Sequence, residues 1–177
     1  MPAQIATVPV TGTWYRHVPS DASPMPMPGH TAGDGRWQRG EQVAGLYVAQ
    51  DPDTVWAEWY RALAELGEPP DARLPRDLWR FTLNLQRVAD LSTPAALRSL
   101  GLPDVLPNRS QWPAFQDAGH RLAADDFAGV LFRSSARPTD GLCVCVFATE
   151  QGFPGVRATG SPNRITAAPV PPRGMRT

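Results

Sequence analysis

The sequence predicts an α+β fold, in which helices pack on a mostly antiparallel sheet. Two observations support this prediction. Segments with strand-like and helix-like patterns follow one another in the order strand, strand, helix, strand, helix, helix, strand, strand. The chain has 177 residues, of which 42% are hydrophobic and 19% charged, so it is large enough to bury a core without disulfides or metals. We therefore expect a single domain over residues 1–150.

The first part of the chain contains two expected strands and one helix. The strands lie at residues 13–17 and 46–49. The Pro-rich segment between them, residues 19–35, is long for a loop, and long ordered loops often cover functional sites. Asp51, followed by proline at the first helical position, is a strong helix start. The apolar spacing that follows predicts a helix that stops near Gly67.

The second part begins with an alternating segment, residues 78–88, that is typical of a half-buried strand. Two further helices and two further strands are expected over residues 93–100, 112–124, 129–132 and 142–148. The last segment, residues 151–177, has few large apolar residues and many Pro, Gly and Arg. We expect it to be a loosely held C-terminal tail.

Charge and hydropathy narrow the class of protein. The formal net charge is zero and all 17 basic residues are Arg, so no basic stripe indicates direct contact with nucleic acid or an anionic membrane. The longest apolar run, residues 142–148, is too short to span a bilayer. Residues 1–13 have neither a basic leader nor a continuous apolar stretch. These features favour a cytoplasmic protein.

The sequence predicts neither a metal site nor a bound cofactor. Cys143 and Cys145 lie two apart in an expected strand, which places both on one face beside Phe147 as small core residues. A metal site needs ligands at a recognisable spacing, whereas the histidines are scattered along the chain. They are His17, His30 and His120.

Two candidate site residues lie in neighbouring expected elements. Glu58 falls on the edge of the apolar stripe of its helix, where a carboxylate is half shielded from water. Taken alone, such a residue is more often a solvated helix glutamate. Tyr47 points away from the strand face of its two neighbours, and its ring is suited to stacking on a nicotinamide or adenine. A lone tyrosine is more often part of a core.

Four more candidates flank loops and turns. Arg16 and Arg36 stand at the two ends of the Pro-rich loop, where guanidinium groups can bind a diphosphate or a carboxylate. Ser134 and Ser135 follow an expected strand at its carboxyl end, a common position for ligand-binding side chains. Serine in a turn usually caps the local backbone instead.

Five short motifs occur in order along the chain. They are Tyr15-Arg16, Gly35-Arg36-Trp37, Leu46-Tyr47-Val48-Ala49 before Asp51-Pro52, Ala57-Glu58, and Ser134-Ser135-Ala136-Arg137. In this order they resemble the RES domain family, named for its Arg, Glu and Ser, over about residues 13–150. By motif, the family's active-site positions match Arg16, Arg36, Tyr47, Glu58 and Ser135, with Ser134 as the alternative serine.

The resemblance implies an ADP-ribosyltransferase-like fold and a bacterial toxin that consumes NAD as its substrate. It also implies a partner, an Xre-type antitoxin that blocks the cleft. Cleavage between nicotinamide and ribose leaves positive charge on the sugar, as in glycoside hydrolysis. The expected catalytic residues are Glu58, Arg36 and Ser135. The expected substrate-binding residues are Arg16 and Arg36 on the diphosphate, Tyr47 stacked on nicotinamide, and Ser134.

Several alternatives stay open. The acceptor is water, phosphate or a protein side chain, and Trp56 stands two residues before Glu58, where ADP-ribosyltransferases often have a second carboxylate. This favours NAD breakdown over modification of a cellular protein. An RNA-cutting toxin is disfavoured by the zero net charge, and a non-catalytic nucleotide-binding module is a further rival. An exposed Trp37, Trp56 or Trp112 is a candidate anchor for a homo-oligomer or antitoxin interface.

Overall fold

The computed structural model describes residues 5–26 and 33–176. Six strands form one sheet in the order β1-β2-β5-β4-β3-β6. Among the described strands, β3 and β4 run parallel and the other neighbours are antiparallel. The strands are β1 (Thr7–Pro19), β2 (Gly45–Ala49), β3 (Arg76–Asp90), β4 (Gly129–Arg133), β5 (Leu142–Phe147) and β6 (Val156–Ile165). The expected α+β fold with a mostly antiparallel sheet is confirmed.

The sheet closes on itself because β1 pairs with both β2 and β3. The two contacts are very unequal. β1 pairs with β3 along almost its whole length, from Thr7 to Pro19, but its ladder with β2 is a single register pair, Tyr15 with Ala49. β1 and β2 therefore separate beyond this pair, and an opening forms between them.

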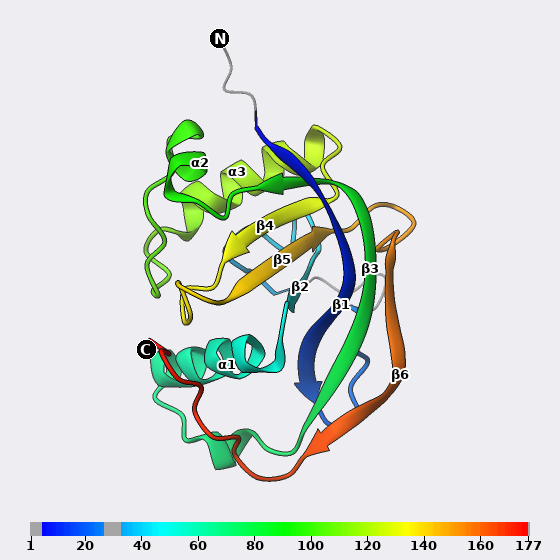
Figure 1. Cartoon of the computed structure of the whole chain (residues 1–177), viewed down its shortest axis with the longest axis vertical. Helices are drawn as coiled ribbons and strands as arrows, with labels where there is room; N and C mark the ends of the chain where they lie inside the picture. Colours follow the sequence, from blue (N-terminus) through cyan, green and yellow to red (C-terminus); the bar gives the residue numbers. More distant parts are fainter. Residues whose placement is uncertain (1–4, 27–32, 177) are drawn as a thin grey trace.

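The helices are α1 (Pro52–Leu66), α2 (Pro94–Ser99) and α3 (Trp112–Ala124), with a short 3-10 helix at Pro70–Arg73. Figure 1 shows α2 and α3 together near one end of the sheet and α1 apart from them, directly after β2. The expected helix start at Asp51 is confirmed, since its carboxylate accepts a hydrogen bond from the Thr54 amide at 2.7 Å. The expected stop is also confirmed, because Gly67 caps α1 with φ of 67°.

Strand β5 separates two apolar clusters. Cys143, Cys145 and Phe147 lie in the cluster that packs under α1 and α3, whereas Val144 and Val146 lie in the other. Both cysteines are buried and unpaired, as predicted. Burial raises the pKa of Cys145 to about 12, so this thiol stays protonated and behaves as a small core residue.

Two strands differ from the expectations. β1 begins at Thr7, six residues earlier than the expected strand at residues 13–17, because β3 provides a partner along the added length. Residues 156–165 form β6 against β3, whereas the sequence favoured a loosely held tail from residue 151. β6 is an edge strand with mostly exposed side chains, so it lacks the apolar alternation that predicts strands.

None of the helices in the described parts of the chain is long and apolar enough to cross a membrane. Pro28 and His30 of the Pro-rich loop lie outside the described residues.

Candidate active site

A cavity of about 620 Å³ opens between β1, β2, α1 and the Pro-rich loop. Five residues predicted from the sequence line it together: Arg16, Arg36, Tyr47, Glu58 and Ser135. Ser134 does not line the cavity but lies directly behind it, in contact with Glu58. The structure thus brings side chains from five separate motifs to one place.

The carboxylate of Glu58 is the most constrained group in the cavity. Its side chain is 28% exposed, in agreement with the half-shielded position expected from the helix pattern. Oε1 accepts hydrogen bonds from the hydroxyl of Ser134 at 2.6 Å and the amide of Ala136 at 3.3 Å. Oε2 accepts one from Arg61 Nε at 3.0 Å. With both oxygens engaged in hydrogen bonds, the carboxylate is held in one orientation.

The two adjacent serines have different positions. Ser134 is fully buried, and its Oγ also accepts from the amides of Ala136 and Arg137 at 3.2 and 3.0 Å. Ser134 therefore fixes the turn after β4 and presents its proton to Glu58. Ser135 lines the cavity, with its Oγ at 3.5 Å from Glu58 Oε1. Of the two, Ser135 is the one that a ligand can reach.

Arg137 fastens this turn to the start of α1. Its Nη1 donates to Asp51 Oδ1 and to Thr54 Oγ1, each at 3.1 Å. Asp51 is also the N-cap of α1. The helix that carries Glu58 and the turn that orients it are thus joined both at the carboxylate and at the helix start.

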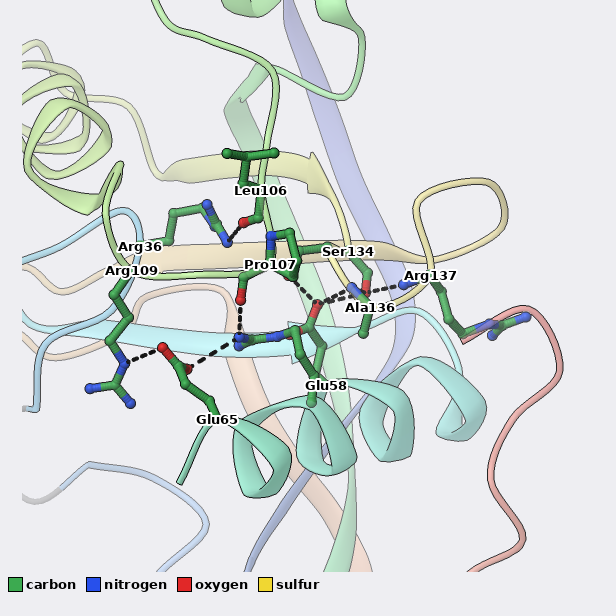
Figure 2. A network of polar contacts seen from close by, with 11 residues as sticks. Arg36, Glu58, Glu65, Leu106, Pro107, Arg109, Ser134, Ala136 and Arg137 are labelled. Atoms are coloured by element: carbon green, nitrogen blue, oxygen red, sulfur yellow. Dashed lines mark hydrogen bonds and ion pairs between the residues drawn. The ribbon is translucent and has the colours of Figure 1, made fainter. Parts of the chain in front are cut away.

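Arg61 is a site residue that the sequence analysis missed. Besides Glu58, its guanidinium contacts Glu65 at 3.5 Å and the carbonyl of Pro107 at 2.7 Å. Arg109 in turn pairs with Glu65 at 3.2 Å. Figure 2 shows Glu58 and Glu65 on one side of α1, with Arg109 and Pro107 in the loop that follows α2. The spacing of three residues between Glu58 and Arg61 is the signal that would have identified Arg61.

Arg36 and Tyr47 are held by backbone groups. Nη2 of Arg36 donates to the carbonyl of Leu106 at 2.8 Å, while its buried Nη1 finds no partner among the described residues. Burial lowers the pKa of Arg36. The phenol of Tyr47 accepts from the Trp37 amide at 2.8 Å, and burial raises its pKa. Gly35 is required here, because a Cβ would lie 2.4 Å from the phenol oxygen.

The opposite end of the cavity contains Arg16, His17 and Arg76. Nη1 of Arg16 donates to the carbonyl of Tyr47 at 3.2 Å, and its buried Nε has no hydrogen-bond partner within the described chain. Arg76 donates to His17 Nδ1 from Nε at 3.0 Å and Nη2 at 2.7 Å. Burial, then Arg76 and Arg16, lower the pKa of His17 to about 3. His17 is therefore neutral, with its proton on Nε2.

Two of the three tryptophans considered as surface anchors are buried instead. Trp37 is 0% exposed and Trp56 is 6% exposed, and Trp56 stacks on His17 with 5.3 Å between ring centroids. The prediction that they are exposed is wrong because both rings complete the cluster under α1 and α3. Trp112 lines the cavity. Within the described residues, no three His, Cys, Asp or Glu side chains are grouped to hold a metal ion.

Comparisons with known proteins agree with this architecture. A sequence model described as the RES domain matches residues 13–167, so the match includes β6. Among solved structures, the chain is similar to the crystal structure of the M. tuberculosis MbcT-MbcA toxin-antitoxin complex, with 23% identity and a TM-score of 0.77. That likeness covers 90% of this chain and 87% of the other, and at this identity it shows a shared fold. No curated protein sequence matches the chain.

Proposed function

The chain belongs to the RES domain family, and we propose that it is the toxin of a toxin–antitoxin pair and cleaves NAD between nicotinamide and ribose. The observation that carries the proposal is the doubly held carboxylate of Glu58 in the wall of a cavity that also contains Arg16 and Arg36. A cavity of about 620 Å³ has the size of a large organic ligand.

Glu58 is suited to stabilise the transition state of this cleavage. When the bond from C1′ to the nicotinamide nitrogen breaks, the electron pair leaves with nicotinamide, and positive charge spreads over C1′ and the ring oxygen of ribose. The departing ring is neutral, so it needs no acid. A carboxylate that is already oriented by Ser134, Ala136 and Arg61 reorganises little as this charge develops, and fixed charges of this kind are effective catalytic groups.

The arginines supply the binding of the two phosphates. Arg36 Nη1 and Arg16 Nε are buried donors without partners in the described chain, so each arginine has a donor to offer to a phosphate oxygen. Each hydrogen bond between charged groups contributes about 1.5–3 kcal/mol. Tyr47 offers its ring to nicotinamide, and Ser135 offers its hydroxyl to the carboxamide or the ribose. Anchoring the diphosphate fixes the sugar against Glu58.

The burial of Trp56 bears on the acceptor. The position two residues before Glu58 is an indole in the apolar core, so no second carboxylate stands there to activate a protein acceptor. We therefore favour transfer to water or phosphate over modification of a cellular protein.

The proposed partner is an antitoxin protein of the Xre type that blocks the cavity. Support comes from the family and from the fold shared with a protein whose structure is described as a toxin-antitoxin complex.

The test is chromatography of NAD after incubation with the purified chain, freed of any partner, with and without inorganic phosphate. We expect release of nicotinamide by the native chain and a large loss with Glu58→Gln, a variant of almost the same shape. Dependence on phosphate would separate phosphorolysis from hydrolysis. Binding of NAD without any nicotinamide release would support the non-catalytic module, and cleavage of total RNA in a parallel incubation would support the RNA-cutting rival.

A further inference from the structure

After β6 the chain turns back across the molecule, and Arg176 lies beside the turn after β4 that carries Ser134 to Arg137. We call residues 166–176 the C-terminal strap. Figure 2 shows its ribbon next to the turn that carries Ala136 and Arg137. The RES domain match ends at residue 167, so most of the strap lies beyond the part of the chain that the family description covers.

The strap is attached to α1 at Tyr60. The phenol of Tyr60 donates a hydrogen bond to the carbonyl of Pro169. Burial, with a smaller contribution from Asp71, raises the pKa of Tyr60, so the phenol keeps its proton at neutral pH and remains a donor. Tyr60 lies two residues from Glu58 on the same helix.

The strap is attached to the turn at Ala136. The amide of Arg176 donates to the carbonyl of Ala136 at 2.8 Å. The amide of the same Ala136 donates to Glu58 Oε1 at 3.3 Å. Ala136 is fully buried, and it is therefore held by the carboxylate on one side and by the strap on the other.

Little apolar burial holds the strap in place. Most of its residues are exposed, and Val170 is 88% exposed. A segment with so few buried contacts contributes little to the core. Its two hydrogen bonds instead go to α1, which carries Glu58, and to the turn, which binds the Glu58 carboxylate.

We propose that the C-terminal strap is a positioning element for the catalytic carboxylate. It links Tyr60 on α1 to Ala136 in the turn, and so limits the distance between the helix that carries Glu58 and the amide that orients Oε1. As a statement about catalysis this rests on the proposed function; as a statement about the position of Glu58 it does not. The backbone amide of Arg176 and the phenol of Tyr60 have a positioning role and do not contact substrate.

The test compares Arg176→Pro with Arg176→Ala. Proline has no amide hydrogen, so the first variant loses the bond to Ala136, whereas alanine keeps it. The Arg176 side chain is exposed and forms no hydrogen bond or ion pair in the described structure, so Arg176→Ala is a matched control. With NAD as the probe, we expect Arg176→Pro to lower kcat about tenfold through misplacement of Glu58, with KM within about twofold. Arg176→Ala should keep the native values.

Amide hydrogen exchange measures the same effect without activity. In Arg176→Pro, the amides of Ala136 and Arg137 should exchange about tenfold faster than in Arg176→Ala, while the amides of β3 and β5 are unchanged. Tyr60→Phe removes the other attachment and should produce the same local increase, which covers the case in which the proline variant folds poorly.

The possible outcomes are distinct. Faster exchange together with a lower kcat supports the inference. Equal exchange in the proline and alanine variants, or faster exchange with an unchanged kcat, overturns it. If the native chain does not cleave NAD, the proposed function fails. Faster exchange at Ala136 in Arg176→Pro would then still support the role of the strap in positioning Glu58. Unchanged exchange would reject this role as well as the proposed function.

Discussion

The two ends of the cavity compensate their charges in opposite ways. At the α1 end, charges alternate along Glu58, Arg61, Glu65 and Arg109, with 3.0–3.5 Å between partners. At the β1 end, Arg16 and Arg76 stand on either side of a neutral His17. Neither of these two arginines forms an ion pair within residues 5–26 and 33–176.

This difference indicates two tasks. A network of alternating ion pairs fixes a carboxylate in one geometry and gains stability from its contacts. Buried positive charge without a partner costs stability, because burial disfavours the charged form; accordingly, burial lowers the pKa of Arg16 and of Arg76. Binding of an anionic ligand would offset this cost, because an opposite charge nearby favours the charged form of arginine. Under the proposed function, the first end orients the carboxylate that acts on the ribose, and the second supplies positive charge for the phosphates.

The largest effect is expected from removing the charge of Glu58 at the first end. Glu58→Gln keeps the shape but removes the charge, so kcat for nicotinamide release should fall by about 10²-fold or more. NAD affinity, measured by calorimetry, should change only a few-fold, because the arginines that we propose to bind the phosphates are unchanged. An unchanged kcat would remove Glu58 from the reaction.

The next largest effect is expected at the second end, where loss of the Arg16 charge should weaken NAD binding but not lower stability. Arg16→Gln should weaken NAD binding by about 10- to 100-fold, the loss of one or two hydrogen bonds between charged groups. Its melting temperature should not fall, since the buried charge has no carboxylate partner. Calorimetry and thermal unfolding measure the two quantities. A clear drop in melting temperature with native affinity would mean that Arg16 is a structural residue.

A smaller effect distinguishes the two serines. Ser134→Ala removes the 2.6 Å bond to Glu58 and the acceptor for two turn amides, so we expect kcat to fall about tenfold and stability by about 1–2 kcal/mol. Ser135→Ala should leave stability unchanged and alter KM instead. Steady-state kinetics and urea unfolding of both variants test this, and the reverse assignment would show that Ser134 is the residue that contacts substrate.

The last prediction concerns a pH dependence of stability at the second end. His17 has a folded pKa of about 3 against an ordinary value of 6.5, so between these values the unfolded chain binds the proton and the folded chain does not. Stability should therefore decrease as pH falls through this window, by up to about 1.4 kcal/mol per pH unit. His17→Phe keeps a ring against Trp56 and should flatten the slope between about pH 5 and 6.5. Urea unfolding at several pH values measures it, and identical slopes would show that His17 is not the titrating group.

Elements with local signals were predictable. The Asp51 N-cap and Gly67 fixed both ends of α1, and the two-residue spacing of Cys143 and Cys145 gave the correct face of β5. β6 was not predictable, because it is held from outside its own sequence. Thr159 contacts Thr82 at 3.0 Å, and Arg164 pairs with Asp77 at 2.9 Å. Both contacts depend on the register with β3.

The site shows the same division. The positions around Glu58 followed from motif order and from helix geometry. The contact of Arg76 with His17 could not be predicted, because it joins residues 59 apart in the sequence through the pairing of β1 with β3. The support of Glu58 from Ala136 and the strap likewise depends on backbone groups, which every residue has and no sequence pattern marks.

The single register pair between β1 and β2 determines the entrance to the cavity. If the two strands continued to pair, Tyr47 would bond to β1 through its backbone; instead the Arg16 side chain supplies a donor to its carbonyl. The width of the cavity entrance thus depends on the residue at which the pairing of β1 with β2 stops. We expect an insertion or deletion that extends the pairing of β1 with β2 to narrow this opening, whereas substitution of the surrounding side chains would leave the separation of the strands unchanged.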